Sequence, residues 1–183
     1  CAKDIDAAQS STLGLLANSR STTLWLGIGS GAIGVLMAAW VALCLGVGVL
    51  GNLATATQVA TWYPTIAKPS WTPPNWLFPI AWTVLYTMIA VAGWKVWEVE
   101  GVKAALVVWG LSLLFNMAWS WIMFGRQEIG LAFIDLVLLW ISIVAFIILA
   151  WPVSQTAAYL FIPYFFWVSF AGALNFAVWR LNP

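Results

Sequence analysis

Long stretches without a charged residue constrain this chain more than any other feature of its sequence. No Asp, Glu, Lys or Arg occurs at 21–67, 69–94 or 136–179. Of all 183 residues, 7% are charged and 63% are apolar. A water-soluble domain carries far more charge on its surface. The sequence therefore predicts an integral membrane protein, in a bacterial or an organellar membrane.

The interruptions of these stretches divide the chain into spans of about 20 residues, the length that crosses roughly 30 Å of hydrocarbon. Prolines exclude a regular helix at 69–77, and Pro152, Ser154 and Gln155 divide the last stretch. We predict an all-α bundle of five transmembrane helices at about 24–51, 78–99, 103–124, 129–151 and 157–179, forming one domain (24–183) after a polar extension (1–23). The segment 52–67 is expected to be too polar to continue the first helix. The positions of Lys and Arg leave the orientation open.

Several kinds of chemistry are excluded by what the sequence lacks. It has no His, and its two Cys, Cys1 and Cys44, lie far apart, which excludes zinc sites, Ser-His-Asp hydrolysis and His-ligated haem. A net charge of +1 without a basic cluster argues against nucleic-acid binding. We therefore expect no metal, no required cofactor and no nucleic acid. An initial Cys fits a processed lipoprotein, a cleaved targeting segment or a truncated sequence, and these alternatives stay open.

The chain contains 15 tryptophans, more than membrane-interface positions require. Indoles at helix ends are ordinary, because the ring is apolar and the N–H needs a polar partner. Within a span, an indole N–H must find a partner or a cavity. The tryptophans expected within spans are Trp40, Trp82, Trp109, Trp119, Trp121, Trp140 and Trp167.

Helical spacing gathers some of these aromatic residues into two stripes. Phe78, Trp82 and Tyr86 share one face, and Pro163, Trp167, Ala171 and Asn175 share another. Asn116 is expected to point into the bundle, because lipid would not accept its amide. Together these faces could enclose a flat, largely apolar ligand, with Tyr86, Asn116 and Asn175 as polar contacts.

Three other features invite a role. The segment Trp62–Trp76 is stiff, aromatic and rich in proline, which predicts a lid. Asp135 lies within a span, so either it serves function or it bonds to a neighbouring helix. Small residues at Gly27, Gly31, Ala38, Ala42 and Gly46 form a face for close helix packing.

Motifs from Trp62 onwards resemble the translocator protein or tryptophan-rich sensory protein (TspO/MBR) family. They are Lys68-Pro69-Ser70-Trp71-Thr72-Pro73-Pro74, Phe78-Pro79, Trp82, Leu85-Tyr86, Asn116 with Trp119, Gly125-Arg126-Gln127, Asp135-Leu136, Pro163-Tyr164 with Trp167, and Leu174-Asn175-Phe176 with Trp179-Arg180 and Asn182. Their order and spacing match the family over the rest of the chain.

The resemblance implies a five-helix bundle, often dimeric, with a cavity beneath the first loop that binds porphyrins and synthetic isoquinoline-type ligands. By analogy, the ligand-binding residues are Trp71, Trp76, Phe78, Trp82, Tyr86, Asn116, Trp167 and Ala171. Some relatives are reported to promote light-dependent breakdown of protoporphyrin, which would assign a part to Trp82 and Trp167. In the sterol-recognition pattern, Phe176 stands where Tyr is expected, which argues against sterol binding.

Three functions follow as hypotheses. The first is a membrane receptor or carrier for tetrapyrroles and related planar hydrophobic ligands, linked to tetrapyrrole or stress regulation. The second adds photo-oxidative degradation of protoporphyrin; because no acid/base pair or metal site is seen, enzyme activity stays open. The third is an accessory subunit of a larger membrane complex, suggested by the extension at 1–23 and by aromatic side chains that could contact other proteins.

Overall fold

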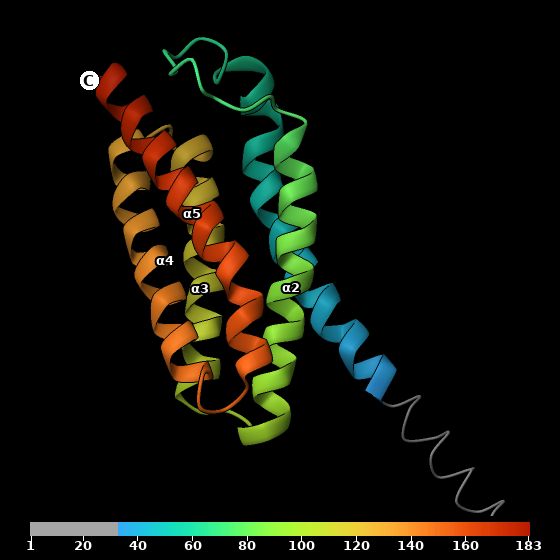
Figure 1. The fold of residues 1–183 in the computed structure, drawn as a ribbon. Helices are drawn as coiled ribbons and strands as arrows, with labels where there is room; N and C mark the ends of the chain where they lie inside the picture. The colour runs from blue at the N-terminus through green and yellow to red at the C-terminus, as the bar shows by residue number, and fades with distance from the viewer. Residues whose placement is uncertain (1–32) are drawn as a thin grey trace, which may run out of the picture. The chain divides into compact units, whose positions relative to one another are not determined.

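The computed structural model describes residues 33–183, and over this range every element of regular structure is helical. A first helix, Ile33–Thr61, is followed by α2 (Leu77–Glu100), α3 (Ala104–Ser120) with a π-helical turn (Trp121–Gly125), α4 (Ile129–Ala150) and α5 (Gln155–Leu181) (Figure 1). With α3 and its π turn counted together, five helices of the described range are long and apolar enough to cross a membrane. The predicted fold class, an all-α integral membrane protein, is confirmed.

The chain divides between Ala39 and Trp40 into two units. The second unit, Trp40–Pro183, contains most of the first helix and all of α2–α5, and the packing described below lies within it. The polar extension expected at 1–23, the helix start expected at residue 24, and Gly27 and Gly31 lie outside the described residues.

The first helix continues past Gly51 to Thr61, so the prediction that it ends at Gly51 is wrong. Thr55 and Thr61 donate their hydroxyls to the carbonyls of Gly51 and Thr57, four residues earlier in the helix. These bonds satisfy the hydroxyl donors within the helix. Val59 also packs against buried residues of the bundle. Polar residues therefore mark the helix end poorly here, whereas Pro64 stands just beyond it.

The helices of the second unit form a closed bundle. α4 packs between α3 and α5, α2 packs against α5, and the first helix contacts α2 and α3. Trp40 on the first helix meets Trp97 of α2 and Trp109 of α3, at centroid distances of 6.2 and 4.9 Å. The core holds fully buried Ile89, Phe146, Phe161 and Tyr164, among others.

Two glycines allow the first helix to approach its neighbours. A Cβ on Gly48 would lie 2.6 Å from the Tyr86 ring of α2, and one on Gly51 would lie 3.1 Å from the Ser120 hydroxyl of α3. Gly46, which the sequence placed on the packing face, has nothing within 4 Å of such a Cβ, and Ala42 is exposed. The close contact therefore uses Gly48 and Gly51, a different stripe from the one expected.

The loop between the first helix and α2 lies at the same end of the bundle as the last turn of α5 (Figure 1). The end of α3 and the start of α4 are joined there by the π turn and by Gln127, whose φ is 58°. This end of the bundle carries the candidate site.

Candidate functional site

An aromatic seam joins α2 and α5 beneath the loop. Trp82 lies at its centre, with ring centroids 5.5 Å from Tyr86, 6.2 Å from Tyr164 and 6.3 Å from Trp167. Phe78 contacts the same Trp167 at 5.9 Å in an edge-to-face arrangement. Of the two stripes expected from helical spacing, Trp167 on α5 therefore contacts Phe78 and Trp82 on α2. These ring pairs adopt the tilted or edge-on geometry that aromatic rings prefer.

A chain of hydrogen bonds ties this seam to α3. The buried Tyr86 hydroxyl donates to Asn116 Oδ1 at 2.5 Å, and Asn116 Nδ2 donates to the Tyr164 hydroxyl at 3.0 Å. One amide thus connects α2, α3 and α5. Because Asn116 bonds to two phenols, its contribution to a ligand site is to hold the Tyr86 and Tyr164 rings in place.

Asn175, the third polar residue expected to contact a ligand, is also committed to protein partners. Its Oδ1 accepts the Trp119 indole N–H at 2.9 Å, and its Nδ2 donates to the Ile129 carbonyl at 3.0 Å. This side chain fixes the start of α4 against α3 and α5.

The indole N–H groups fall into two classes. Trp109 donates to the Ile89 carbonyl and Trp140 to the Ser169 hydroxyl, as Trp119 does to Asn175. Within residues 33–183, the indole N–H groups of Trp82 and Trp167 make no hydrogen bond to another residue. The two tryptophans at the centre of the seam are therefore donors that a ligand could use.

The loop is fastened over this end of the bundle. The Ala67 N–H donates to Asn182 Oδ1 at 3.0 Å, and Asn182 Nδ2 donates back to the Ala67 carbonyl at 2.9 Å. Lys68 Nζ donates to the carbonyls of Tyr63 and Ile66 at 2.5 and 2.8 Å. The loop is thus held both to α5 and to itself.

Aromatic contacts seal the edges of the same loop. Burial raises the pKa of the Tyr63 phenol, so the neutral ring lies beneath the Lys68 ammonium, 4.8 Å from its centroid. Tyr63 also packs on Phe124, and Trp71 contacts Phe170 of α5 at 5.8 Å. These contacts give the segment the covering position expected of a lid.

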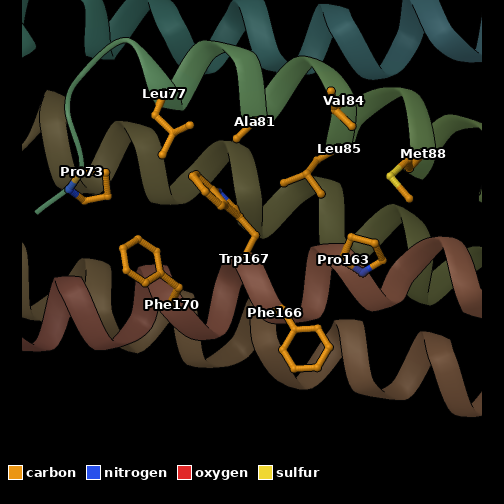
Figure 2. A pocket seen from close by; sticks show the side chains of 10 residues that line it. All are labelled: Pro73, Leu77, Ala81, Val84, Leu85, Met88, Pro163, Phe166, Trp167 and Phe170. Atoms are coloured by element: carbon orange, nitrogen blue, oxygen red, sulfur yellow. The ribbon is translucent and has the colours of Figure 1, made fainter. Parts of the chain in front are cut away.

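An apolar groove opens beside the seam, on the outer side of α2 and α5 (Figure 2). Its volume is about 680 Å³. Figure 2 shows the Trp167 indole reaching from α5 towards Leu77 and Ala81 of α2. The lining residues all have apolar or aromatic side chains and are Pro73, Leu77, Ala81, Val84, Leu85, Met88, Pro163, Phe166, Trp167 and Phe170.

Some of the expected ligand-binding residues lie together in the structure, and others lie apart from them. Phe78, Trp82, Tyr86 and Trp167 lie together in the seam, and Asn116 lies behind them. Ala171, one turn after Trp167, packs partly buried against the core. Trp71 reaches the seam through Phe170 but is 49% exposed, and Trp76 is 65% exposed. Trp76 is therefore the expected residue that the structure connects least with the others.

Sequence reasoning missed most of the groove. Leu77, Ala81, Val84 and Met88 recur every three to four residues on α2, one position away from the aromatic stripe. That spacing is the available signal, and it is identical for a face that contacts lipid and a face that lines a groove.

Asp135 stays without an assigned partner. The residue is 8% exposed, and its Oδ2 is buried without a hydrogen-bond partner in the described part of the chain. The bond to a neighbouring helix that the sequence left as one alternative is not formed within residues 33–183 by this oxygen. The same range contains no cluster of His, Cys, Asp or Glu able to hold a metal ion.

The family model described as TspO/MBR family matches residues 40–180, which covers the first-helix segment of the second unit and α2–α5 except the last residue of α5. The chain belongs to the TspO/MBR family. The family resemblance inferred from the loop and helix motifs is thereby confirmed.

Relatives in the TspO/MBR family come from distant organisms. The chain is 41% identical to the "Tryptophan-rich protein TspO" of Chlorobaculum tepidum over 151 residues, 80% of this chain and 96% of that protein. It is 39% identical to the "Protein CrtK" of Rhodobacter capsulatus, over 81% of this chain and 93% of the relative. It is 36% identical to the "Translocator protein" of Bos taurus, over 74% of this chain and 83% of that protein. The similarity therefore extends along nearly the whole bundle.

Proposed function

We propose that this TspO/MBR protein is a membrane receptor or carrier that binds tetrapyrroles, such as protoporphyrin, and related planar hydrophobic ligands in a pocket beneath the first loop. The observation that carries the proposal is the seam of Phe78, Trp82, Tyr86 and Trp167, in which rings from two helices face each other. A flat conjugated ring can stack on aromatic side chains, and ligand pockets are lined mainly by apolar and aromatic residues.

The free indole donors support the same ligand class. A tetrapyrrole carries carboxylate side chains as well as an apolar ring, so it needs a few donors in a largely apolar site. Trp82 and Trp167 offer N–H groups without protein partners in the described range, whereas Trp109 and Trp140 do not. The names of the relatives, "tryptophan-rich sensory protein" and "translocator protein", fit a receptor or a carrier.

The experiment is a titration in the dark of the detergent-solubilised chain with protoporphyrin, followed by tryptophan quenching. We expect saturable binding with a dissociation constant of about 1 μM or lower. The variant Trp82→Phe with Trp167→Phe should bind more weakly, because the central indoles and their donors are altered. The matched control, Trp109→Phe with Trp140→Phe, removes two indoles whose N–H groups bond to protein and should retain native affinity. Non-saturable quenching, equal in all three proteins, would overturn the proposal.

Two additions to this experiment address the other hypotheses. Under illumination, a porphyrin-degrading activity predicts a new product absorbance that requires light and intact Trp82 and Trp167. An accessory-subunit role predicts partners that co-purify at fixed stoichiometry, and the receptor proposal does not require them.

A further inference from the structure

The α2–α5 groove opens on the side of the bundle that faces lipid. Val84 and Phe166 on its rim are 54% and 65% exposed. Along α2 the lining runs from Leu77 to Met88, which is about 17 Å at a rise of 1.5 Å per residue. The groove therefore extends from the lid end of the bundle to near the middle of the span, at the depth of the hydrocarbon. A molecule that enters it from outside comes from the bilayer interior.

The route from water is obstructed at the same end of the molecule. Asn182 holds the Ala67 peptide through both its N–H and its carbonyl, and Lys68 caps two further loop carbonyls. Opening this lid breaks several hydrogen bonds at once, whereas the groove carries no polar side chain other than the Trp167 indole.

Trp167 belongs to both features. One part of its ring lines the groove, and the ring also contacts Phe78 and Trp82 of the seam. We infer that the planar ligand reaches the seam sideways from the bilayer through the α2–α5 groove, with Trp167 as the gate. The inference rests on the proposed function, since it concerns the route to the proposed pocket.

The backbone of α5 is suited to such a gate. Pro163 lies inside α5, one turn before Trp167, and lines the same groove. Proline has no N–H, so the carbonyl of Tyr159 lacks its helical partner at this level. A helix that lacks one backbone bond bends more readily than an uninterrupted one. Trp167 therefore stands next to the weakest backbone position of the helix that carries it.

The test measures rates as well as affinity. Native protein and variants are reconstituted in vesicles of one lipid composition, and protoporphyrin association and dissociation are followed by stopped-flow quenching at several protein densities. Val84→Trp fills the groove at an exposed position that tolerates a larger side chain. Ile80→Trp is the matched control, because Ile80 is 56% exposed on the same helix and does not line the groove. Asn182→Ala releases the lid.

If the groove is the route, Val84→Trp slows association and dissociation by the same factor, about tenfold, and leaves the dissociation constant unchanged. Ile80→Trp and Asn182→Ala keep native rates. Native rates in Val84→Trp combined with faster association in Asn182→Ala would overturn the inference and favour entry beneath the lid. A weakened dissociation constant at a native association rate would also overturn it, because Val84 would then contact the bound ligand. Absence of binding by the native chain would instead remove the proposed function itself.

Discussion

Asn116 holds two tyrosine rings of the site, Tyr86 and Tyr164, in position. Its side chain joins the hydroxyls of Tyr86 and Tyr164, and all three residues are buried within membrane-spanning helices. In hydrocarbon, an unpaired hydroxyl or amide finds no water to replace its partner. The three side chains therefore position one another, and the rings of the seam depend on an amide that lies behind them.

Replacement of Asn116 by leucine tests this dependence. Asn116→Leu keeps the volume of the side chain but leaves both phenols without their partner, so we expect a loss of about 1–2 kcal/mol in unfolding free energy. Unfolding of the detergent-solubilised protein measures it. Ser112→Ala is the control, since the hydroxyl of buried Ser112, one turn earlier on α3, donates to the Trp109 carbonyl of its own helix. Equal stability of the two variants would contradict the linking role of Asn116.

At the scale of single residues, the sequence predicts which side chains share a helix face better than it predicts their hydrogen-bond partners. The spacing of Phe78, Trp82 and Tyr86 predicts a shared face because helix geometry alone determines it. Which indole donates to protein depends on neighbouring helices, so the difference between Trp82 and Trp140 is visible only in the folded bundle. For the same reason, the protein partners of Asn116 and Asn175, both predicted as ligand contacts, are visible only in the folded bundle.

At the scale of the helices, the first helix is positioned by glycine. Gly48 meets the edge of the Tyr86 ring, whereas Gly46, two residues earlier, meets open space. Tyr86 thus holds both the seam and the contact between the first helix and α2.

Alanine at these two positions separates helix propensity from packing. Gly46→Ala should stabilise the protein slightly, by about 0.5–1 kcal/mol, because alanine favours the helix. Gly48→Ala gains the same propensity but places a methyl group 2.6 Å from the Tyr86 ring, so we expect a net loss of about 1–2 kcal/mol. Thermal unfolding of both variants measures the difference. If Gly48→Ala proves as stable as Gly46→Ala, the two helices are not in close contact there.

Helix positions were more accessible to sequence reasoning than helix faces. α2, α4 and α5 begin and end within two residues of the expected positions, and so does α3 when its π turn is counted with it, because prolines and charges mark their ends. The first helix was expected to end too early, since threonine and glutamine resemble a loop composition although they bond within the helix. The groove stripe of α2 could not be recognised, because apolar residues suit lipid and a groove equally.

At the scale of the whole molecule, we assign the outer surface of the bundle to the hydrocarbon of the membrane. Ile141 is 52% exposed near the middle of α4. An arginine there would change the free energy little in water but would raise the free energy of membrane insertion by on the order of 3 kcal/mol. Leu131 is 39% exposed near the start of α4. An arginine that replaces it can extend its side chain to the membrane interface. We expect Ile141→Arg to reduce membrane insertion strongly and Leu131→Arg to reduce it little, as measured by the fraction of chain integrated into membranes. Equal insertion would contradict the assigned span.

The central claim, that a planar ligand binds at the seam beneath the loop, is tested most directly by the position of the bound ligand. Protoporphyrin bound in the dark and then illuminated briefly in oxygenated buffer oxidises nearby indoles, and mass spectrometry identifies the modified tryptophans. If the ligand binds at the seam, modification occurs first at Trp82 and Trp167 and is suppressed by an excess of a competing planar ligand. Trp121 and Trp151, 48% and 44% exposed and outside the seam, serve as internal controls. Modification that begins at Trp121 and Trp151 and spares Trp82 and Trp167 would contradict the account.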